Sequence, residues 1–381
     1  MKLNNMEGAK KIVKEIDLQS SEFFESDGLL NGKAGLIYYY YCLYKHFGKE
    51  DILDKISINL ELILKNIETQ DSSLLFDSSL QNGLSGLGYI LYLLTEGNII
   101  DADFEDQIKV INEIVFADAL KLIENRNYDF MGGPFGILFY LNFAKDKQHV
   151  NDLVGILYNE FEKNNEFTFY NETNYLEGVH IGYAHGICAI VKVLDEIEDT
   201  RCDIMIAKLL QKLITIINSN KVEINKKKYF LPRSIHKNEI YDGELNFRAV
   251  LAWSNCDVNF STLIYSIKEK HVTQEALKLA DMIALESLGK RHKDDTMVWD
   301  HRFFFGSSGV LQMYNYLYQK TNDDRYYHAS KFWYDETLFF LSKNTVEENP
   351  LDFINNLPAT ALALLEFEES QSLGWSKILL L

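Results

Sequence analysis

The feature that most restricts the fold of this chain is a repeat of about fifty residues. Small residues of the kind that form tight turns recur ahead of apolar runs. The seven positions are Gly32, Gly83, Gly133, Gly186, Cys256, Gly306 and Asn356, where Cys256 and Asn356 are degenerate copies. Their successive spacings are 51, 50, 53, 70, 50 and 50 residues. Such a period indicates one supersecondary unit repeated along the chain.

Each unit combines two segments of helical periodicity. The turn precedes an apolar run, as at 36–47 and 310–318, and a second helical segment, such as 51–68, lies ahead of most turns. Seven such hairpins predict about fourteen helices in one domain spanning residues 1–381. They form either an open solenoid or a closed α/α toroid. In a closed toroid the N-termini of the inner helices meet at one end, where their dipoles favour anions and thiolates. The repeat therefore places the site at the turns.

The 70-residue spacing contains an insertion at about residues 220–250. Its residues alternate as in a strand, and it carries the basic cluster Lys226, Lys227 and Lys228. Two interpretations stay open, a solvated surface loop and a docking edge for a partner or peptide.

Composition limits the class of protein. Of 381 residues, 47% are hydrophobic, which is enough for a large core. The net charge of −18 argues against a nucleic-acid partner, because phosphate binding requires a basic surface. Residues 1–19 lack the apolar core of a signal peptide, and no apolar stretch is long enough for a membrane span. We therefore expect a cytoplasmic protein with no integral membrane segment, and four scattered cysteines fit a reducing compartment.

The residue before each turn position separates ordinary repeats from unusual ones. In repeat order these residues are Asn31, Asn82, Gly132, His185, Asn255, Phe305 and Asn355. The asparagines suggest a shared role in capping or bonding the turn. His185 and Phe305 depart from that pattern, and departures from a repeat are where function is expected.

Motifs in the same order resemble those of the lanthionine synthetase C (LanC) family of peptide cyclases, over essentially the whole chain. YDFMGGPFGI (128–137) resembles the family's Tyr-Asp motif, and GYAHGICAI (182–190) resembles its G-x-A-H-G turn. AWSNCDVNF (252–260) stands where the family has Trp-Cys-Tyr-Gly-Asp, and FFGSSGV (304–310) where it has Cys-His-Gly. The closing GWSKILLL is similar to the family's final Trp motif.

The resemblance implies an all-α fold, the α/α toroid, and a role in lanthipeptide-type ribosomal peptide biosynthesis. The family closes thioether rings by adding a peptide cysteine thiol to a dehydroamino acid that a dehydratase has made. The implied partners are thus a dehydrated precursor peptide and a dehydratase. In the family a zinc ion, held by two cysteines and one histidine, binds the substrate thiol.

Carried over by position, all three zinc ligands are replaced. The two cysteines fall on Ser254 and Phe304, and the histidine falls on Phe305. Serine is a poor zinc ligand and phenylalanine cannot bind a metal. We therefore expect no cofactor. A metal site rebuilt from Cys256, Asp257 and His301 is the alternative.

The acid/base positions of the family are kept. We expect His185 to transfer the proton and Asp129 to orient it, above an apolar floor of Phe304 and Phe305. The other pocket candidates are Tyr183, Arg248, Trp253, Ser254, Cys256 and Asp257. Arg248 lies two residues from Val250, the position at which the family often carries an arginine.

Structural explanations compete at each of these residues. His185 could bond backbone like the asparagines, Asp129 could cap its turn, and the two phenylalanines could fill a disused site. The first functional hypothesis is a zinc-independent cyclase. The second is a non-catalytic scaffold that holds the peptide or the dehydratase. A barrel glycosidase is a distant third, because it needs two carboxylates facing one cleft.

Overall fold

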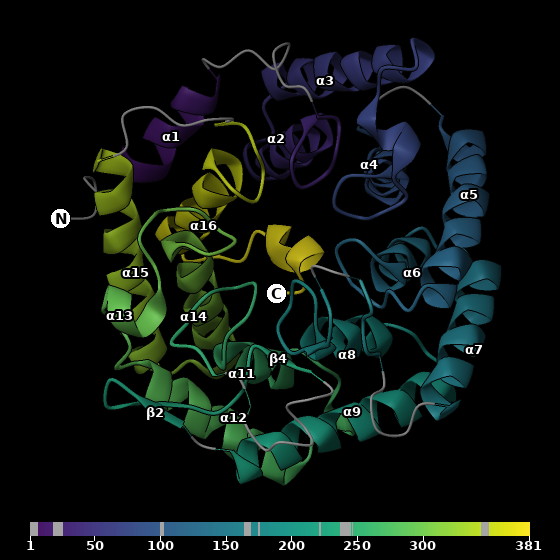
Figure 1. Ribbon diagram of the computed structural model, residues 1–381. Helices are drawn as coiled ribbons and strands as arrows, with labels where there is room; N and C mark the ends of the chain where they lie inside the picture. The colour runs from purple at the N-terminus through teal and green to yellow at the C-terminus, as the bar shows by residue number, and fades with distance from the viewer. Residues whose placement is uncertain are drawn as a thin grey trace.

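The computed structural model describes residues 7–17, 26–99, 103–163, 169–173, 176–220, 222–236, 245, 247–343 and 350–381. Within them the chain forms two concentric rings of helices (Figure 1). The inner ring consists of α2 (Lys33–Phe47), α4 (Leu84–Glu96), α6 (Pro134–Phe143), α8 (Ile187–Asp195), α11 (Val258–Ile264), α14 (Ser307–Thr321) and α16 (Leu357–Glu369). The outer ring consists of α1 (Glu7–Asp17), α3 (Asp51–Glu68), α5 (Glu105–Glu124), α7 (Lys147–Lys163), α9 (Thr200–Ser219), α12 (Gln274–Ser287) and α15 (Asp324–Lys343).

The inner ring is closed. Each inner helix contacts the next, and α16 contacts α2, so the last repeat meets the first. Each inner helix also packs on the outer helix that follows it, while α16 uses α1 from the other end of the chain. The seven-hairpin α/α toroid expected from the sequence is thereby confirmed.

Helix composition explains the two layers. The inner helix α6, PFGILFYLNF, carries apolar residues on every face, and seven of its ten residues are buried. The outer helix α3 buries one stripe, which includes Ile52, Ile56, Leu60 and Ile63, and turns charged residues to solvent. A helix that is apolar all round belongs in a core, whereas an amphipathic one covers it.

Close backbone approach explains the turn glycines. Gly83 precedes α4 with φ −119°, and Gly186 precedes α8 with φ −134°, so neither needs a left-handed backbone. A Cβ atom on Gly83 would lie 2.2 Å from the Asp77 carbonyl oxygen, and one on Gly186 would lie 2.5 Å from the backbone of His180 and Ile181. These turns therefore require glycine because neighbouring backbone atoms leave no room for a side chain, and not because the backbone is left-handed.

A belt of backbone hydrogen bonds joins equivalent turns. In six of the seven repeats, the N–H two residues before the turn position donates to the carbonyl of the equivalent residue in the next repeat. The bonds are Leu30 to Gln81 (2.8 Å), Gln81 to Met131 (3.2 Å), Ala184 to Ser254 (3.1 Å), Ser254 to Phe304 (3.3 Å), Phe304 to Ile354 (3.3 Å) and Ile354 to Leu30 (3.2 Å). Ser254 and Phe304 are therefore true structural equivalents, as the repeat frame predicts. The fifth inner helix, α11, begins one residue later than that frame.

The insertion forms short antiparallel pairs. Strand β2 (Val222–Ile224) pairs with β3 (Lys227–Tyr229), and β4 (Ser234–Ile235) pairs with β1 (Val179–His180), which precedes the fourth turn. Residues 221, 237–244 and 246 of the insertion lie outside the described residues. The β1–β4 pair brings Arg233 next to the fourth turn. A four-residue helix, α13 (Lys293–Thr296), and the 3₁₀ helices η2 (Ser73–Phe76), η3 (Glu269–His271) and η4 (Trp375–Leu379) complete the described elements.

The C-terminal segment occupies the centre of the toroid, where η4 lies among the inner helices (Figure 1). The indole Nε1–H of Trp253 donates to the Leu379 carbonyl at 3.0 Å, and the Tyr38 hydroxyl donates to the Trp375 carbonyl at 2.7 Å. The C-terminal segment is therefore hydrogen-bonded to Trp253, at the fifth turn, and to Tyr38, on α2. None of the described helices is both long and apolar enough to span a bilayer.

Candidate active site

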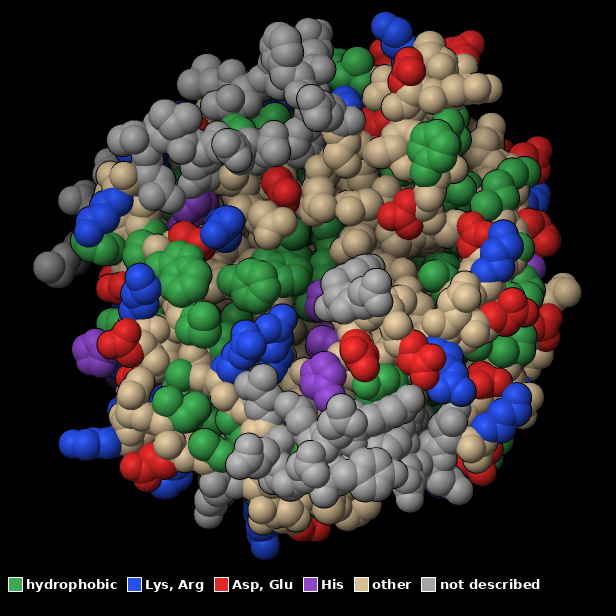
Figure 2. All heavy atoms as spheres, viewed as in Figure 1, with side chains coloured by type: hydrophobic (Ala, Val, Ile, Leu, Met, Phe, Trp, Pro, Cys, Tyr) green, Lys and Arg blue, Asp and Glu red, His purple; other side chains and the backbone are tan. Residues whose placement is uncertain are grey.

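A cavity of about 170 Å³ lies at the end of the toroid where the inner helices begin. Four of the side chains expected from the sequence line it, namely His185, Ser254, Phe304 and Phe305. His180 and Arg233 also line it and were not expected. On the face shown in Figure 2, histidine side chains lie near the centre beside basic and hydrophobic ones. The cavity thus combines a base, a cation, a hydroxyl and an apolar wall.

The centre of the site is a hydrogen-bonded pair that bridges two repeats. His185 Nδ1 lies 2.8 Å from Asp129 Oδ1. The Asp129 side chain is 2% exposed, while that of His185 is 29% exposed at the cavity. A carboxylate at Nδ1 holds the neutral imidazole in the tautomer that leaves Nε2 unprotonated. This arrangement is the geometry of an oriented general base.

Asp129 also caps its own turn. Its Oδ2 accepts the Gly132 N–H at 2.7 Å, while its own N–H donates to Asn127 Oδ1 at 3.0 Å. The capping interpretation is therefore correct, but it accounts for only one carboxylate oxygen. His185, by contrast, bonds a carboxylate of the neighbouring repeat, whereas the amide of its equivalent Asn255 donates to the Arg233 carbonyl at 3.0 Å.

A second histidine lies beside the pair. The rings of His180 and His185 are 6.2 Å apart between centroids, and His180 Nε2–H donates to the Leu176 carbonyl at 3.2 Å. Burial, followed by the charge of His185, lowers the pKa of His180 to about 4. His180 is therefore neutral near pH 7 and does not compete with His185 for the proton.

The repeat contained a clue to His180. Six residues before the turn position, a polar side chain accepts a backbone N–H in the first, second, third and sixth repeats. The acceptors are Ser26, Asp77, Asn127 and Asp300. His180 holds that position in the fourth repeat and breaks the pattern, just as His185 does. Val250 and Pro350 hold it in the fifth and seventh repeats, so His180 is the one polar side chain at this position that departs from the pattern.

The three positions onto which the resemblance carries zinc ligands all line the cavity, but their side chains do not fit the ion. Ser254 offers one hydroxyl, and Phe304 and Phe305 offer only rings, 4.5 Å apart between centroids. A zinc site needs nitrogen, sulfur or carboxylate ligands. Phe305 is 53% exposed and Phe304 is half-buried, so the two rings line the cavity and leave it open.

Cys256 and Asp257 lie outside the cavity, contrary to their expected place in the pocket. Burial raises the pKa of the Cys256 thiol to about 12. Asp257 accepts the Leu231 N–H at 3.0 Å and forms a buried ion pair with Lys290 at 3.1 Å. That carboxylate therefore anchors the insertion to the ring. Within the described part of the chain, Cys256, Asp257 and His301 form no metal-binding group.

Three more pocket candidates lie beside the cavity without lining it. Trp253 and Tyr183 are fully buried, and their rings stack with centroids 6.5 Å apart. The ring of Trp253 also contacts that of Phe304 edge-on, at 5.6 Å between centroids. These aromatic rings therefore pack behind the Phe304 side of the cavity. Arg248 is exposed, and its charge, after burial, lowers the pKa of Arg233. The two arginines are thus close enough to repel each other.

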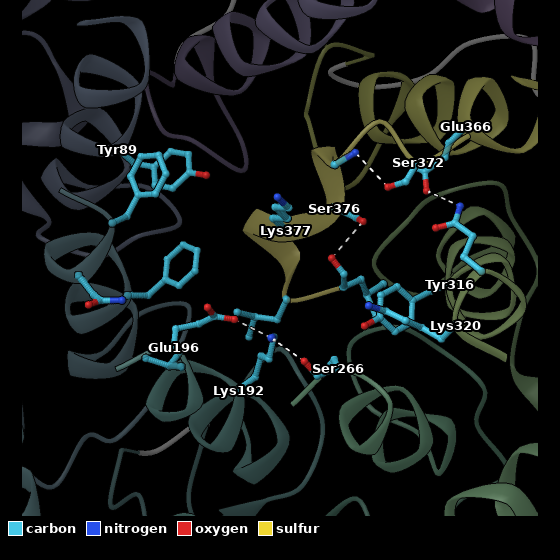
Figure 3. A pocket seen from close by; sticks show the side chains of 18 residues that line it. Tyr89, Lys192, Glu196, Ser266, Tyr316, Lys320, Glu366, Ser372, Ser376 and Lys377 are labelled. Atoms are coloured by element: carbon cyan, nitrogen blue, oxygen red, sulfur yellow. Dashed lines mark hydrogen bonds and ion pairs between the residues drawn. The ribbon is translucent and has the colours of Figure 1, made fainter. Parts of the chain in front are cut away.

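A larger cavity of about 640 Å³ lies at the opposite end, where the inner helices finish (Figure 3). Lys192 lines it, but its ammonium is already held by Glu196 at 2.6 Å and by the Ser266 carbonyl at 3.1 Å. Part of its wall is the C-terminal segment, including Lys377. The smaller cavity is the better candidate, because the oriented histidine–carboxylate pair is there.

Comparisons with known proteins agree with this description. The family model described as "Lanthionine synthetase C-like protein" matches residues 3–118 and 105–357. A solved structure described as nisin cyclase is similar with a TM-score of 0.76 and 19% sequence identity, over 99% of this chain and 97% of that one. A search of curated proteins gave no significant match.

Proposed function

Because the chain belongs to the lanthionine synthetase C-like family, we propose that it closes thioether rings in a dehydrated precursor peptide. A cysteine thiol of the peptide adds to the Cβ of a dehydroalanine or dehydrobutyrine residue. The observation that carries this proposal is the bond between His185 Nδ1 and Asp129 Oδ1 at the wall of an open cavity. It supplies an oriented base where the inner helix N-termini converge.

His185 acts twice in the proposed reaction. Its Nε2 removes the proton of the cysteine thiol, and the sulfur then adds to Cβ. The electron pair of the Cα=Cβ double bond moves onto the adjacent carbonyl and forms an enolate. The imidazolium returns its proton to Cα, so the addition is balanced without another reactant. Asp129 keeps Nδ1 protonated throughout and stabilises the imidazolium between the two steps.

The family's zinc is not required energetically for this reaction. A thiol with a pKa of about 8.5 is roughly 3% ionised at pH 7, so complete ionisation gains at most about 30-fold. That gain corresponds to about 2 kcal/mol of barrier. A well-placed general base supplies about 10²–10⁴-fold. The pair His185–Asp129 can therefore offset the loss of the thiol-binding metal, and we propose a cyclase without a cofactor.

The apolar side chains give the substrate a dry floor. Phe304 lies between His185, at 6.4 Å between ring centroids, and Trp253, at 5.6 Å. Phe305 continues this surface towards solvent. An apolar wall beside the base excludes water from the thiolate and contacts the methyl or methylene group of the dehydroamino acid. In this proposal a separate dehydratase, working in the cytoplasm, prepares the peptide.

Ring formation leaves the peptide mass unchanged but consumes a thiol, so thiol alkylation followed by mass spectrometry measures it. The test incubates a dehydrated precursor with the protein, with His185→Ala, and with no protein. The proposal predicts that wild type exceeds the uncatalysed rate and that His185→Ala loses about 10²–10⁴-fold. His328→Ala, on the exposed face of the outer helix α15, is the control and keeps the wild-type rate.

If wild type and His185→Ala both match the sample without protein, the cyclase proposal is wrong. Peptide binding in that case would favour the non-catalytic scaffold. Binding is read from the same samples by co-elution of the peptide with the protein.

A further inference from the structure

The cavity contains a hydroxyl group that the fold itself does not use. Ser254 is 4% exposed and lines the cavity, and its Oγ has no hydrogen-bond partner among the described residues. Its backbone is fixed on both sides by the belt, through Ala184 and Phe304. Buried hydroxyls are almost always hydrogen-bonded, and an unsatisfied one lowers stability. A group that is held rigidly and left unpaired in a cavity wall points to a ligand.

Arg233 places a positive charge at the same cavity. Arg233 lines it next to β4, and its carbonyl oxygen accepts the Asn255 amide at 3.0 Å, which ties the arginine to the fifth turn. Within the described residues its guanidinium forms no ion pair. The charged group that acts on Arg233 is a second cation, Arg248, and not a carboxylate. Both arginines are exposed, and neither forms an ion pair in the part of the chain that the structure describes. Two such positive charges beside the cavity, in a chain with a net charge of −18, favour an anionic ligand.

We infer that Ser254 and Arg233 form an oxyanion-binding site, which holds the carbonyl oxygen of the dehydroamino acid while it becomes an enolate. This role rests on the proposed cyclase function. When the thiolate adds to Cβ, the π electron pair moves to the carbonyl oxygen. The Ser254 hydroxyl and the guanidinium N–H groups donate to that oxygen. When His185 protonates Cα, the electron pair returns and the neutral carbonyl leaves the site.

The Arg233 guanidinium is expected to bind the enolate oxygen of the substrate and not its cysteine sulfur. A guanidinium presents planar N–H donors that match an oxygen anion, and the bond is charge-assisted. The sulfur already has a partner in His185, which removes its proton. Donors that wait in place for a charge developing in the transition state raise kcat more than they strengthen substrate binding.

The first part of the test does not depend on turnover. Acetate serves as the oxyanion probe, and its dissociation constant is measured by saturation-transfer NMR in buffer free of other small anions. Wild type is expected to bind it saturably, while Ser254→Ala and Arg233→Gln each weaken binding by about tenfold or more. Arg325→Gln removes the same charge from an outer-ring residue paired with Asp323, and it binds acetate like wild type.

The second part uses the cyclisation assay. Ser254→Ala and Arg233→Gln are expected to lower kcat by about 10²–10³-fold with little change in KM. Arg233→Lys keeps the charge and recovers part of that loss. Ser254→Ala removes an unpaired buried hydroxyl, so its unfolding temperature stays at or above that of wild type. A loss of kcat without a loss of stability separates a catalytic role from a structural one.

The outcomes distinguish this inference from the proposed function. If wild type binds acetate and both variants do not, while wild type closes no ring, the oxyanion site stands and the cyclase function fails. If wild type closes rings while both variants keep wild-type kcat and acetate binding, the cyclase function stands and the oxyanion site is wrong. Absence of saturable acetate binding in wild type also overturns the site.

Discussion

Asp129 and Asp352 occupy the same place in the third and seventh repeats, but only one of them lies at the site. Each stands four residues before its turn position and accepts the N–H three residues later, Gly132 at 2.7 Å and Asn355 at 2.9 Å. The second oxygen of Asp129 binds His185, whereas that of Asp352 lies 3.5 Å from the Asn355 amide nitrogen. Burial accordingly raises the pKa of Asp352.

The difference between the two aspartates separates architecture from chemistry. The cap recurs in three of the seven repeats, since Ser79 accepts the Asn82 N–H in the same way at 3.2 Å. The contact with His185 is an addition found at the junction of the third and fourth turns. Asp129 thus caps its turn with one carboxylate oxygen and binds His185, at the cavity, with the other.

The sharpest test of this comparison replaces each aspartate by asparagine. An asparagine oxygen can still cap the turn, so both proteins are expected to fold. In Asp129→Asn the side-chain amide no longer stabilises His185 as an imidazolium or fixes its tautomer, and kcat falls by about 10²–10⁴-fold. Asp352→Asn keeps the wild-type kcat. Equal effects of the two substitutions on ring formation would mean that Asp129 is only a cap.

The neighbouring histidine predicts a smaller effect, on stability. His180 has a pKa of about 4 in the folded protein, against about 6.5 when unfolded. The unfolded chain therefore binds more protons between these values, so stability is full above pH 6.5 and falls as the pH drops towards 4. The loss is at most about 3 kcal/mol.

Urea unfolding at pH 7 and pH 4.5 measures this effect. The loss of stability on acidification is expected to be smaller in His180→Gln, whose amide can still donate to the Leu176 carbonyl. Equal losses in both proteins would show that His180 is not held neutral by the fold. The seventh repeat offers no such group, because its equivalent position is Pro350.

The smallest predicted effect concerns Asp352 itself. Because its pKa is raised in the folded protein, the folded state binds more protons than the unfolded state above about pH 4. Wild-type stability therefore falls as the pH rises through the pKa of Asp352. Asp352→Asn removes this pH dependence, because asparagine does not titrate. The variant should gain stability relative to wild type as the pH rises above about pH 4. A relative loss over the same range would contradict the raised pKa.

The sequence predicts the architecture well because the architecture repeats. Spacing alone places Ser254 and Phe304 in equivalent turns, and the backbone belt confirms that they are neighbours. The same frame identifies His185 as an exception among asparagines. Its hydrogen bond to Asp129 connects residues 56 positions apart, yet both lie at turns, so the frame brings them to the same end of the ring.

The residues that sequence reasoning missed or misplaced depend on contacts outside the repeat. Arg233 reaches the cavity because β4 pairs with β1, and nothing in the local sequence specifies that pairing. Asp257 matches a family motif but is occupied by Lys290, which belongs to the segment after α12. Turn residues follow the period of the chain, whereas these two depend on where the insertion folds back.

The central claim is that a cavity without the family's metal ligands still closes thioether rings with His185 and Asp129. The most direct test measures the ring-forming rate of wild type after exhaustive chelation and again after zinc is added back. A cyclase that needs no metal is expected to show one rate in both samples, above that of the peptide alone. A rate that disappears on chelation and returns with zinc would contradict it.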